Sequence, residues 1–233
     1  MRKLNWDRGK IVIFCDFDGT ITQTDTLVYL LDNYGAKDWW DIERSLIRGE
    51  INEQEALKRE IETLEVGWEE ALDDLKQAVK IDPGFESFLR WTKSKSIPLI
   101  VLSGGFEEIS WEYLSSDSYV DVEIRANRVE VRGKRWEVIP SERRRIRGRC
   151  NHCKSSSVVD FKQQGYVTIY IGDGTTDRCP ASYADIVFAK DDLAEYCLKE
   201  GWDFILFSDF SEALEKIKRM MNEEQASSLK LQA

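Results

Sequence analysis

The sequence lacks any apolar run long enough to cross a membrane. Its longest apolar stretches, such as IVIFC at residues 11–15, fall far short of the roughly 20 residues that a membrane-spanning helix needs. The N-terminal MRKLNWDRGK has basic residues but no apolar segment of the kind found in secretory signal peptides. We therefore expect a cytoplasmic protein with no membrane partner.

Cysteine is also scarce, with five residues among 233, and the odd number leaves at least one thiol without a partner. Hydrophobic residues make up 42% of the chain, which is enough for a substantial core without a disulfide scaffold. Reduced thiols are the simplest expectation. A chain of this length suits one domain, or one domain that carries a sizeable insertion.

The chain has no excess of positive charge, because its formal net charge is −10 and its pI is near 4.9. That balance argues against a protein whose whole surface binds nucleic acid. Residues 125–154 are an exception, with eleven Lys or Arg against three Glu. The arginines within 143–149 could steer an anionic substrate or bind nucleic acid, although a solvated charged face is the favoured interpretation. An acidic body with one basic strip favours a small anionic ligand over nucleic acid as the partner.

Three short apolar runs rich in Ile and Val predict parallel strands that are buried on both faces, at residues 10–15, 97–102 and 167–171. Each run ends in a polar residue beside glycine, in the sequences DFDGT, SGG and GDGTTD. Helical patterns separate the runs, so strand and helix alternate as in a doubly wound sheet. We expect an α/β fold with a Rossmann-like, mainly parallel sheet.

Two segments break this alternation. Residues 23–82 carry no convincing strand but repeat apolar residues at helical spacing, which predicts an inserted helical cap. Residues 120–138 alternate apolar and charged residues around a turn, which predicts a β-hairpin appendage. The catalytic core is then expected at 1–22 and 83–222, and the polar residues 223–233 are expected to form a disordered tail.

Four carboxylates follow the first and third predicted strands. Asp16 and Asp18 come directly after the first, and Asp173 and Asp177 follow the third at a spacing that would place both on one face of a helix. Ligands bind at the carboxyl ends of the strands in open α/β sheets, so we expect these carboxylates to converge there. A divalent cation would relieve their repulsion, and all-oxygen ligands suit Mg²⁺ best.

With Mg²⁺ placed there, neighbouring residues fit phosphoryl transfer. One of the carboxylates can attack phosphorus to form an aspartyl-phosphate. Ser103 offers a hydroxyl donor, and Gly104 and Gly105 expose backbone N–H groups that favour an anion. Lys154, at the start of a predicted helix, would supply positive charge to the transferring group.

Together these motifs resemble the haloacid dehalogenase-like phosphatases. All four sequence blocks of that family are matched in order, over about residues 10–220: DFDGT at 16–20, Ser103, Lys154 and GDGTTD at 172–177. The helical cap and the LSGGF segment are similar to the phosphoserine phosphatase branch. Thr176 and the run from Cys150 to Lys154 are similar to the methionine-salvage phosphatases of that branch.

The resemblance implies a role for each matched residue. Asp16 would be the nucleophile and Asp18 the general acid and then base, while Ser103 and Lys154 would bind the phosphate. The magnesium ligands would be Asp16, the backbone carbonyl of Asp18 and Asp173. Asp177 would support the site.

Two cap positions bear on the substrate. Asp25 falls where phosphoserine phosphatases place an acid for the substrate amine. Glu60 falls where those enzymes carry an arginine for the substrate carboxylate, and a glutamate there would repel a carboxylate. Both positions come from an ungapped comparison with that branch.

The expected function is Mg²⁺-dependent hydrolysis of a small phosphomonoester, with the methionine-salvage methylthio-ketopentenyl phosphate as one candidate. A phosphoserine- or phosphoethanolamine-type phosphatase, and a phosphotransferase or mutase on the same scaffold, remain alternatives. Cys150, His152 and Cys153 offer three zinc ligands but no fourth, so a loop that positions Lys154 is favoured over a zinc site. The oligomeric state stays open.

Overall fold

The computed structural model describes residues 10–116, 119, 122–139 and 153–230, with side chains up to residue 222. Within these residues the strands are β1 (Ile11–Cys15), β2 (Leu99–Phe106), β3 (Glu123–Arg132), β4 (Arg135–Ile139), β5 (Val167–Gly172), β6 (Ile186–Ala189) and β7 (Ile205–Leu206). The helices are α1 (Thr26–Tyr34), α2 (Trp39–Ile47), α3 (Glu53–Glu62), α4 (Trp68–Ala78), α5 (Phe85–Ser94), α6 (Glu107–Leu114), α7 (Lys154–Gln163), α8 (Arg178–Ala181), α9 (Asp191–Glu200) and α10 (Phe210–Lys230).

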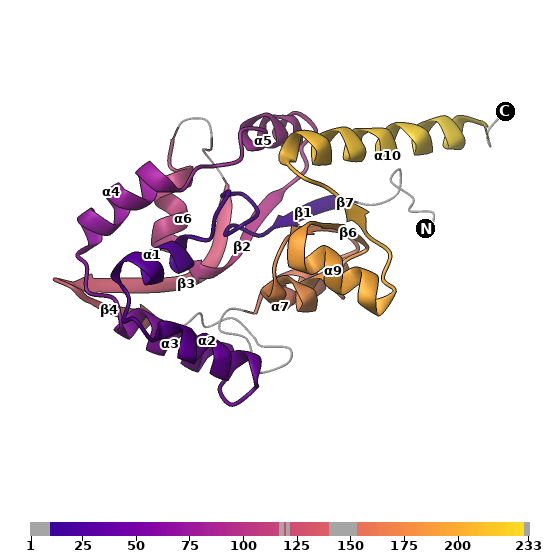
Figure 1. The fold of residues 1–233 in the computed structure, drawn as a ribbon. Helices are drawn as coiled ribbons and strands as arrows, with labels where there is room; N and C mark the ends of the chain where they lie inside the picture. The colour runs from indigo at the N-terminus through magenta and orange to yellow at the C-terminus, as the bar shows by residue number, and fades with distance from the viewer. Residues whose placement is uncertain (1–9, 117–118, 120–121, 140–152, 231–233) are drawn as a thin grey trace.

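The strands of this described part of the chain form one seven-stranded sheet in the order β4-β3-β2-β1-β5-β6-β7 (Figure 1). β1 lies at the centre and pairs in parallel with both β2 and β5. Its residues Val12–Cys15 are completely buried, which is why the run is apolar throughout rather than alternating. The predicted α/β fold with a mainly parallel sheet is confirmed.

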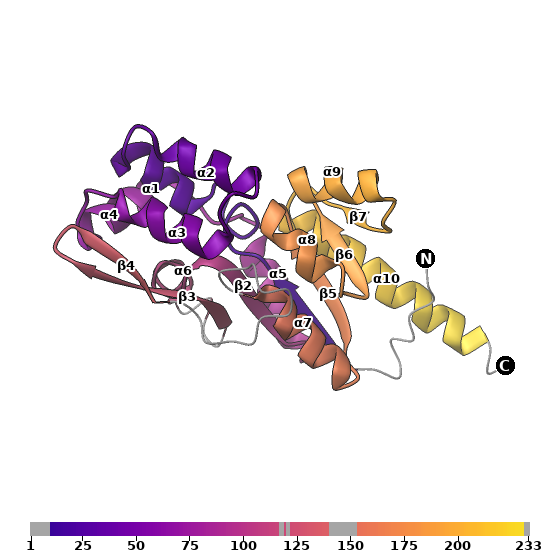
Figure 2. The same cartoon turned by 90° about the horizontal axis from the view of Figure 1, so that it is seen from below.

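Helices cover both faces of the sheet (Figures 1 and 2). Val12 and Phe14 of β1 belong to a core cluster that includes residues of α7, α8 and α9. Ile13 and Cys15 point the other way, into a cluster with α5, α6 and α10. Alternate side chains of one strand therefore serve two different helix layers, as the doubly wound prediction requires.

Helices α1 to α4 lie together to one side of the sheet, in the segment where the sequence predicts a cap (Figure 2). The chain leaves the core and returns to it through one small antiparallel bridge between Thr22 and Ile81. Backbone hydrogen bonds from Gln23 N to Lys80 O (2.8 Å) and from Asp82 N to Ile21 O (2.8 Å) flank this bridge. A pair of adjacent connections of this kind is suited to carrying an inserted cap.

The expected β-hairpin is present, and it also continues the central sheet. β3 pairs in parallel with β2 and antiparallel with β4, so the hairpin forms one edge of the sheet. It also contacts the cap, because the indole N–H of the buried Trp136 donates to Val66 O at 2.9 Å and its ring packs on Trp68. The hairpin therefore links the catalytic sheet to the cap helices.

The last helix runs further than the sequence suggested. α10 spans 21 residues and continues to Lys230, so the expected loss of structure after Asn222 is wrong for residues 223–230. The physical reason is local, because residues 211–230 contain neither glycine nor proline and are rich in good helix formers.

Among the helices of the described residues, none combines the length and apolar character that a membrane crossing requires.

Candidate active site

The candidate site lies where β1, β2 and β5 end. β1 runs directly into Asp16 and β5 into Asp173, and these neighbouring strands are paired in register from Ile11 with Val167 to Cys15 with Ile171. β2, on the other side of β1, carries Ser103. The parallel pairing thus brings three segments that are distant in the sequence to one edge of the sheet, as predicted.

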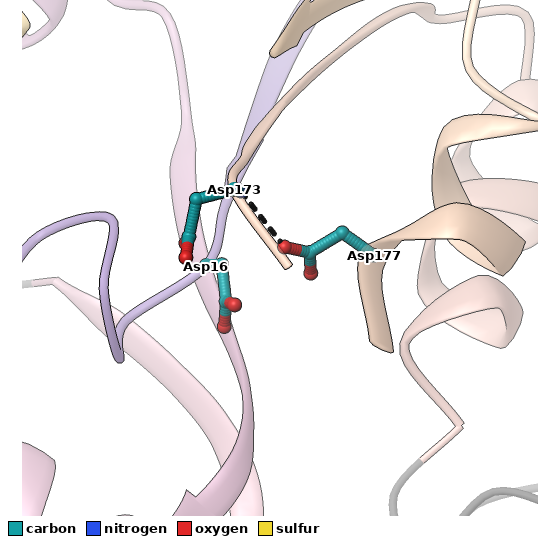
Figure 3. Close-up of side chains that lie close together, drawn as sticks. All are labelled: Asp16, Asp173 and Asp177. Atoms are coloured by element: carbon teal, nitrogen blue, oxygen red, sulfur yellow. Dashed lines mark hydrogen bonds between the residues drawn. The ribbon is translucent and has the colours of Figure 1, made fainter. Parts of the chain in front are cut away.

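Three carboxylates meet at this edge. One oxygen each from Asp16, Asp173 and Asp177 lies within 4.8 Å of the others (Figure 3). Burial raises the pKa of Asp16 well above its ordinary value, and the charge of Asp177 adds to this. Burial, again helped by Asp177, raises the pKa of Asp173 to about 7. Such a cluster is electrostatically unfavourable until a cation or protons balance it, so its oxygen donors fit a hard divalent metal such as Mg²⁺.

Lys154 supplies part of that balance. Its Nζ lies 2.7 Å from Asp16 Oδ1 and 2.7 Å from Asp177 Oδ1, and only 3% of its side chain is exposed. Burial alone would lower the pKa of Lys154, but the two carboxylates raise it above its ordinary value. For Asp177 the two effects have the opposite signs. Burial alone would raise its pKa, but Lys154 lowers it below its ordinary value. Lys154 therefore stays charged at the edge where an anion would bind.

Asp177 reaches the site from a short 3₁₀ turn (Thr175–Asp177), not from the helical face that its spacing with Asp173 suggested. Its Oδ2 accepts backbone N–H groups from Asp173 and Gly174, both at 3.0 Å, and Tyr170 donates its hydroxyl to Oδ1 at 2.6 Å. The first of these contacts is the dashed line in Figure 3. Asp177 thus shapes the loop that carries Asp173, as a supporting residue would.

Asp18 stands apart from the three clustered carboxylates. Its Oδ1 accepts the backbone N–H (3.0 Å) and hydroxyl (2.5 Å) of Thr26, the first residue of α1. Its Oδ2 accepts the hydroxyl of Ser103 at 3.2 Å. From the sequence we predicted that all four carboxylates converge. For Asp18 this is wrong, because the turn after Phe17 directs its side chain toward β2 and the cap. Thr26 was not predicted, and its only local signal is its position at the start of α1.

Gly19 and Thr20 hold the β1 loop against Asp173. Gly19 has φ +74°, a conformation that favours glycine, and a Cβ built on it would lie 2.4 Å from Asp173 Oδ2. Thr20 donates its hydroxyl to Asp173 Oδ1. The glycine of DFDGT is therefore required by both backbone conformation and space.

Of the two cap residues singled out from the sequence, Asp25 lies near Asp18, and Glu60 lies near Glu43 and Asp25. Asp25 caps the N-terminus of α1 by accepting Val28 N–H at 2.9 Å, and burial and then the nearby Asp18 raise its pKa to about 7. Glu60 on α3 is 6% exposed, and its pKa also rises to about 7 because of burial and because of Glu43. The structure thus places acidic groups on the cap, with Asp25 beside the catalytic loop.

Glu60 should make the stability of the protein depend on pH. Its pKa rises from 4.5 in the unfolded chain to about 7 in the folded one, so stability falls as pH rises through that interval. We expect Glu60→Gln to raise the free energy of unfolding at pH 8 by up to about 3 kcal/mol, and to change it little near pH 4.5. Urea unfolding across this range measures the difference.

The exposed Glu62 on the same helix provides the matched control for this prediction. Glu62→Gln should leave the free energy of unfolding nearly the same at every pH. A Glu60→Gln effect that does not grow between pH 4.5 and pH 8 would contradict the assignment of a raised pKa to Glu60.

Several predicted features lie outside the described residues. These are Cys150, His152 and the arginines within 143–149. Cys153, the remaining member of the possible zinc set, is buried at the N-cap of α7, directly before Lys154. That position fits a segment that presents Lys154 to the site.

Comparisons with known proteins agree on the fold and the family. A family model described as haloacid dehalogenase-like hydrolase matches residues 13–181. Among curated proteins, the chain is 29% identical to Pdp3-interacting factor 1 of Schizosaccharomyces pombe, over 91% of this chain and 97% of that protein. It is 28% identical to a polyol phosphate phosphatase of Saccharomyces cerevisiae, over 91% and 94%. It is 26% identical to a 2-hydroxy-3-keto-5-methylthiopentenyl-1-phosphate phosphatase of Geobacillus kaustophilus, over 91% and 97%.

A solved structure shares the fold over nearly its whole length. A substrate-bound phosphoserine phosphatase complex superposes with a TM-score of 0.68 and 21% sequence identity. The match covers 90% of this chain and 99% of that one. Sheet and cap therefore occur together in a known architecture.

Proposed function

Because the chain belongs to the haloacid dehalogenase-like hydrolase family, we propose that it is a phosphatase that hydrolyses a small phosphomonoester through an aspartyl-phosphate on Asp16. The observation that carries the proposal is the contact of Asp16 with the buried, charged Lys154, beside Asp173 and Asp177. This arrangement combines a nucleophilic carboxylate with a cation for the phosphoryl group and oxygen ligands for a metal. Relatives at 26–28% identity that are named as phosphatases of small phosphorylated compounds support it.

In the proposed first step, an oxygen of Asp16 attacks phosphorus and the bond from phosphorus to the ester oxygen breaks. Asp18 gives its proton to the departing alkoxide, so the alcohol leaves neutral. Lys154, the Ser103 hydroxyl and the backbone N–H groups beginning at Gly104 would hold the phosphoryl oxygens.

In the second step, water attacks phosphorus while Asp18 takes up its proton, and the bond from Asp16 to phosphorus breaks to release inorganic phosphate. Asp16, the Asp18 carbonyl and Asp173 would hold Mg²⁺, which when bound would neutralise charge on the phosphoryl oxygens. Asp18 is suited to face the substrate because Thr26 and Ser103 hold its two oxygens between core and cap.

The acidic groups of the cap indicate which chemical groups the organic part of the phosphomonoester substrate carries. Asp25 lies close enough to Asp18 for the charge of Asp18 to raise the pKa of Asp25, and Glu60 is a second acidic residue on the cap. Acidic groups on the cap, which are negative above a pH of about 7, disfavour a substrate carboxylate, and in either protonation state they can bind hydroxyl or amine groups. We therefore propose a neutral or amine-bearing phosphomonoester, with polyol phosphates and the methionine-salvage ester as the leading candidates and phosphoethanolamine next.

A panel of phosphomonoesters tests this function, with Mg²⁺ or EDTA in each assay. We expect phosphate release from at least one polyol phosphate or the methionine-salvage ester, and a fall of about 100-fold or more on metal removal, because metal stabilisation of this kind is worth several kcal/mol. Release should not depend on an added acceptor alcohol. A preference for phosphoserine would contradict the role given to the cap acids, and failure on every ester would contradict the phosphatase itself.

A further inference from the structure

The segment that carries Ser103 leaves the regular pairing of β2 with β3. Leu102 pairs with Arg125, and the next paired residue of β2 is Phe106, opposite Asn127. Three residues of β2, Ser103–Gly105, therefore face a single residue of β3. Such a bulge frees backbone groups from the ladder and lets them face a ligand.

Asn127 lies at the point where the two strands resume their pairing. It is completely buried, and its side-chain amide donates to Gly104 O at 2.9 Å. A buried polar side chain that reaches across a bulge in this way replaces a missing ladder contact. It also fixes the direction of one carbonyl in a segment of two consecutive glycines, which could otherwise rotate freely.

The orientation of the Gly104 carbonyl also sets the direction of the next N–H group. In a planar trans peptide the carbonyl of Gly104 and the N–H of Gly105 point in opposite directions. With the carbonyl held toward Asn127, Gly105 N–H points to Ser103 Oγ at 2.9 Å, and Ser103 in turn donates to Asp18 Oδ2 at 3.2 Å. Four groups are thus connected from the buried Asn127 on β3 to the proposed acid.

Little free space surrounds this chain of contacts. A Cβ built on Gly105 would lie 3.0 Å from Asp18 Oδ2 and 3.3 Å from Ser103 Oγ. A rotation of the Gly104–Gly105 peptide would therefore disturb both the serine hydroxyl and the carboxylate. The hydrogen bond from Asn127 of β3 to Gly104 O anchors the segment on its far side.

We infer that Asn127 is a positioning residue, which orients the Gly104–Gly105 peptide and through it the Ser103 hydroxyl and the Asp18 carboxylate for phosphate binding and proton transfer. The inference rests on the proposed phosphatase function. Asn127 does not touch the reacting atoms. Its effect should therefore appear in kcat and in the affinity for inorganic phosphate, the product that would occupy the donors proposed to hold the phosphoryl group.

The test compares Asn127→Asp with a matched control, Ser110→Ala. Aspartate keeps the size of asparagine but lacks its N–H donors, and in assays at a pH where it is ionised it cannot donate to Gly104 O. Ser110 is equally buried and donates to the neighbouring carbonyl of Phe106 at 3.1 Å, outside the bulge. We expect Asn127→Asp to lower kcat and to raise the inhibition constant of inorganic phosphate, each by about 10- to 100-fold, as for residues that orient a catalytic group. Ser110→Ala should stay within about twofold for both, the range of a substitution that touches no site residue.

Each outcome bears on the inference. An unchanged phosphate inhibition constant in a folded Asn127→Asp protein, or an equal loss in Ser110→Ala, would overturn it. If Asn127→Asp does not fold, Asn127→Ser avoids a buried charge and should show the same rise in the inhibition constant.

A measurement on the unmodified protein stands beside these variants. The side-chain amide protons of Asn127 should exchange slowly with solvent, and their NMR signals should shift when inorganic phosphate is added. Fast exchange together with unchanged signals would contradict the inference. An unmodified protein that releases no phosphate from any ester contradicts the phosphatase function. An active one with unaffected Asn127 variants contradicts only the role of Asn127.

Discussion

Asp16→Asn is expected to abolish phosphate release, with a loss of about 10³-fold or more, as is usual when a nucleophile is removed. An amide oxygen at this position is a poor nucleophile and a weaker metal ligand than a carboxylate. The buried Lys154 would lose one ionic partner and keep Asp177, whose Oδ1 lies 2.7 Å from its Nζ. Initial rates of phosphate release with saturating Mg²⁺ measure the effect.

The same substitution should leave the protein folded. Asparagine has the size of aspartate, and its neutral side chain removes one of three mutually repelling groups at the edge of the sheet. Asp185→Asn is a suitable control, because Asp185 lies near the opposite edge, before β6, and binds Thr168 and Lys162. A folded Asp16→Asn protein that keeps more than a small residual rate would contradict the role of Asp16.

Lys154→Met should both inactivate the enzyme and destabilise its fold. Removing one member of a buried ion pair leaves its partners buried without compensation, which typically costs about 3–5 kcal/mol. Here two carboxylates, Asp16 and Asp177, lose the same cation. Urea unfolding at neutral pH without added metal should show the loss. The deficit should shrink as pH falls and the unpaired carboxylates take up protons.

Lys162 on the same helix provides the matched control for Lys154. Its Nζ lies 2.7 Å from Asp185, but 46% of its side chain is exposed, so this pair is worth about 1 kcal/mol or less. Lys162→Met should therefore change both stability and activity little. Equal destabilisation by the two substitutions would contradict the importance given to the buried Lys154 pair.

The parts of the site that follow directly from strand ends could be predicted from the sequence. The apolar runs before Asp16 and Asp173 predict buried parallel strands, and the structure places these strands side by side with their ends aligned. Lys154 was predicted at a helix start and is the first residue of α7. These predictions succeed because each depends on one short pattern and one rule of sheet geometry.

Other features depend on contacts between distant segments, which no local pattern contains. Asp18 turns toward Thr26 and Ser103 because the chain bends after Phe17, so its side chain does not join the other three carboxylates as expected. Asn127 has no motif of its own, and its importance depends on the bulge of β2 beside it. The sequence also could not predict that β3 pairs with β2 in the central sheet. An alternating hairpin pattern fits a separate appendage as well as it fits an edge of the sheet.

The most direct test of the proposed mechanism is to look for the phosphoryl group on Asp16. The protein would be mixed with Mg²⁺ and the preferred ester, quenched in acid within one turnover, digested, and analysed by mass spectrometry. We predict one added phosphoryl group on the peptide that contains Asp16, absent from Asp16→Asn and lost on treatment with hydroxylamine. Rapid phosphate release with no phosphorylated peptide, or with the group on another residue, would contradict the mechanism.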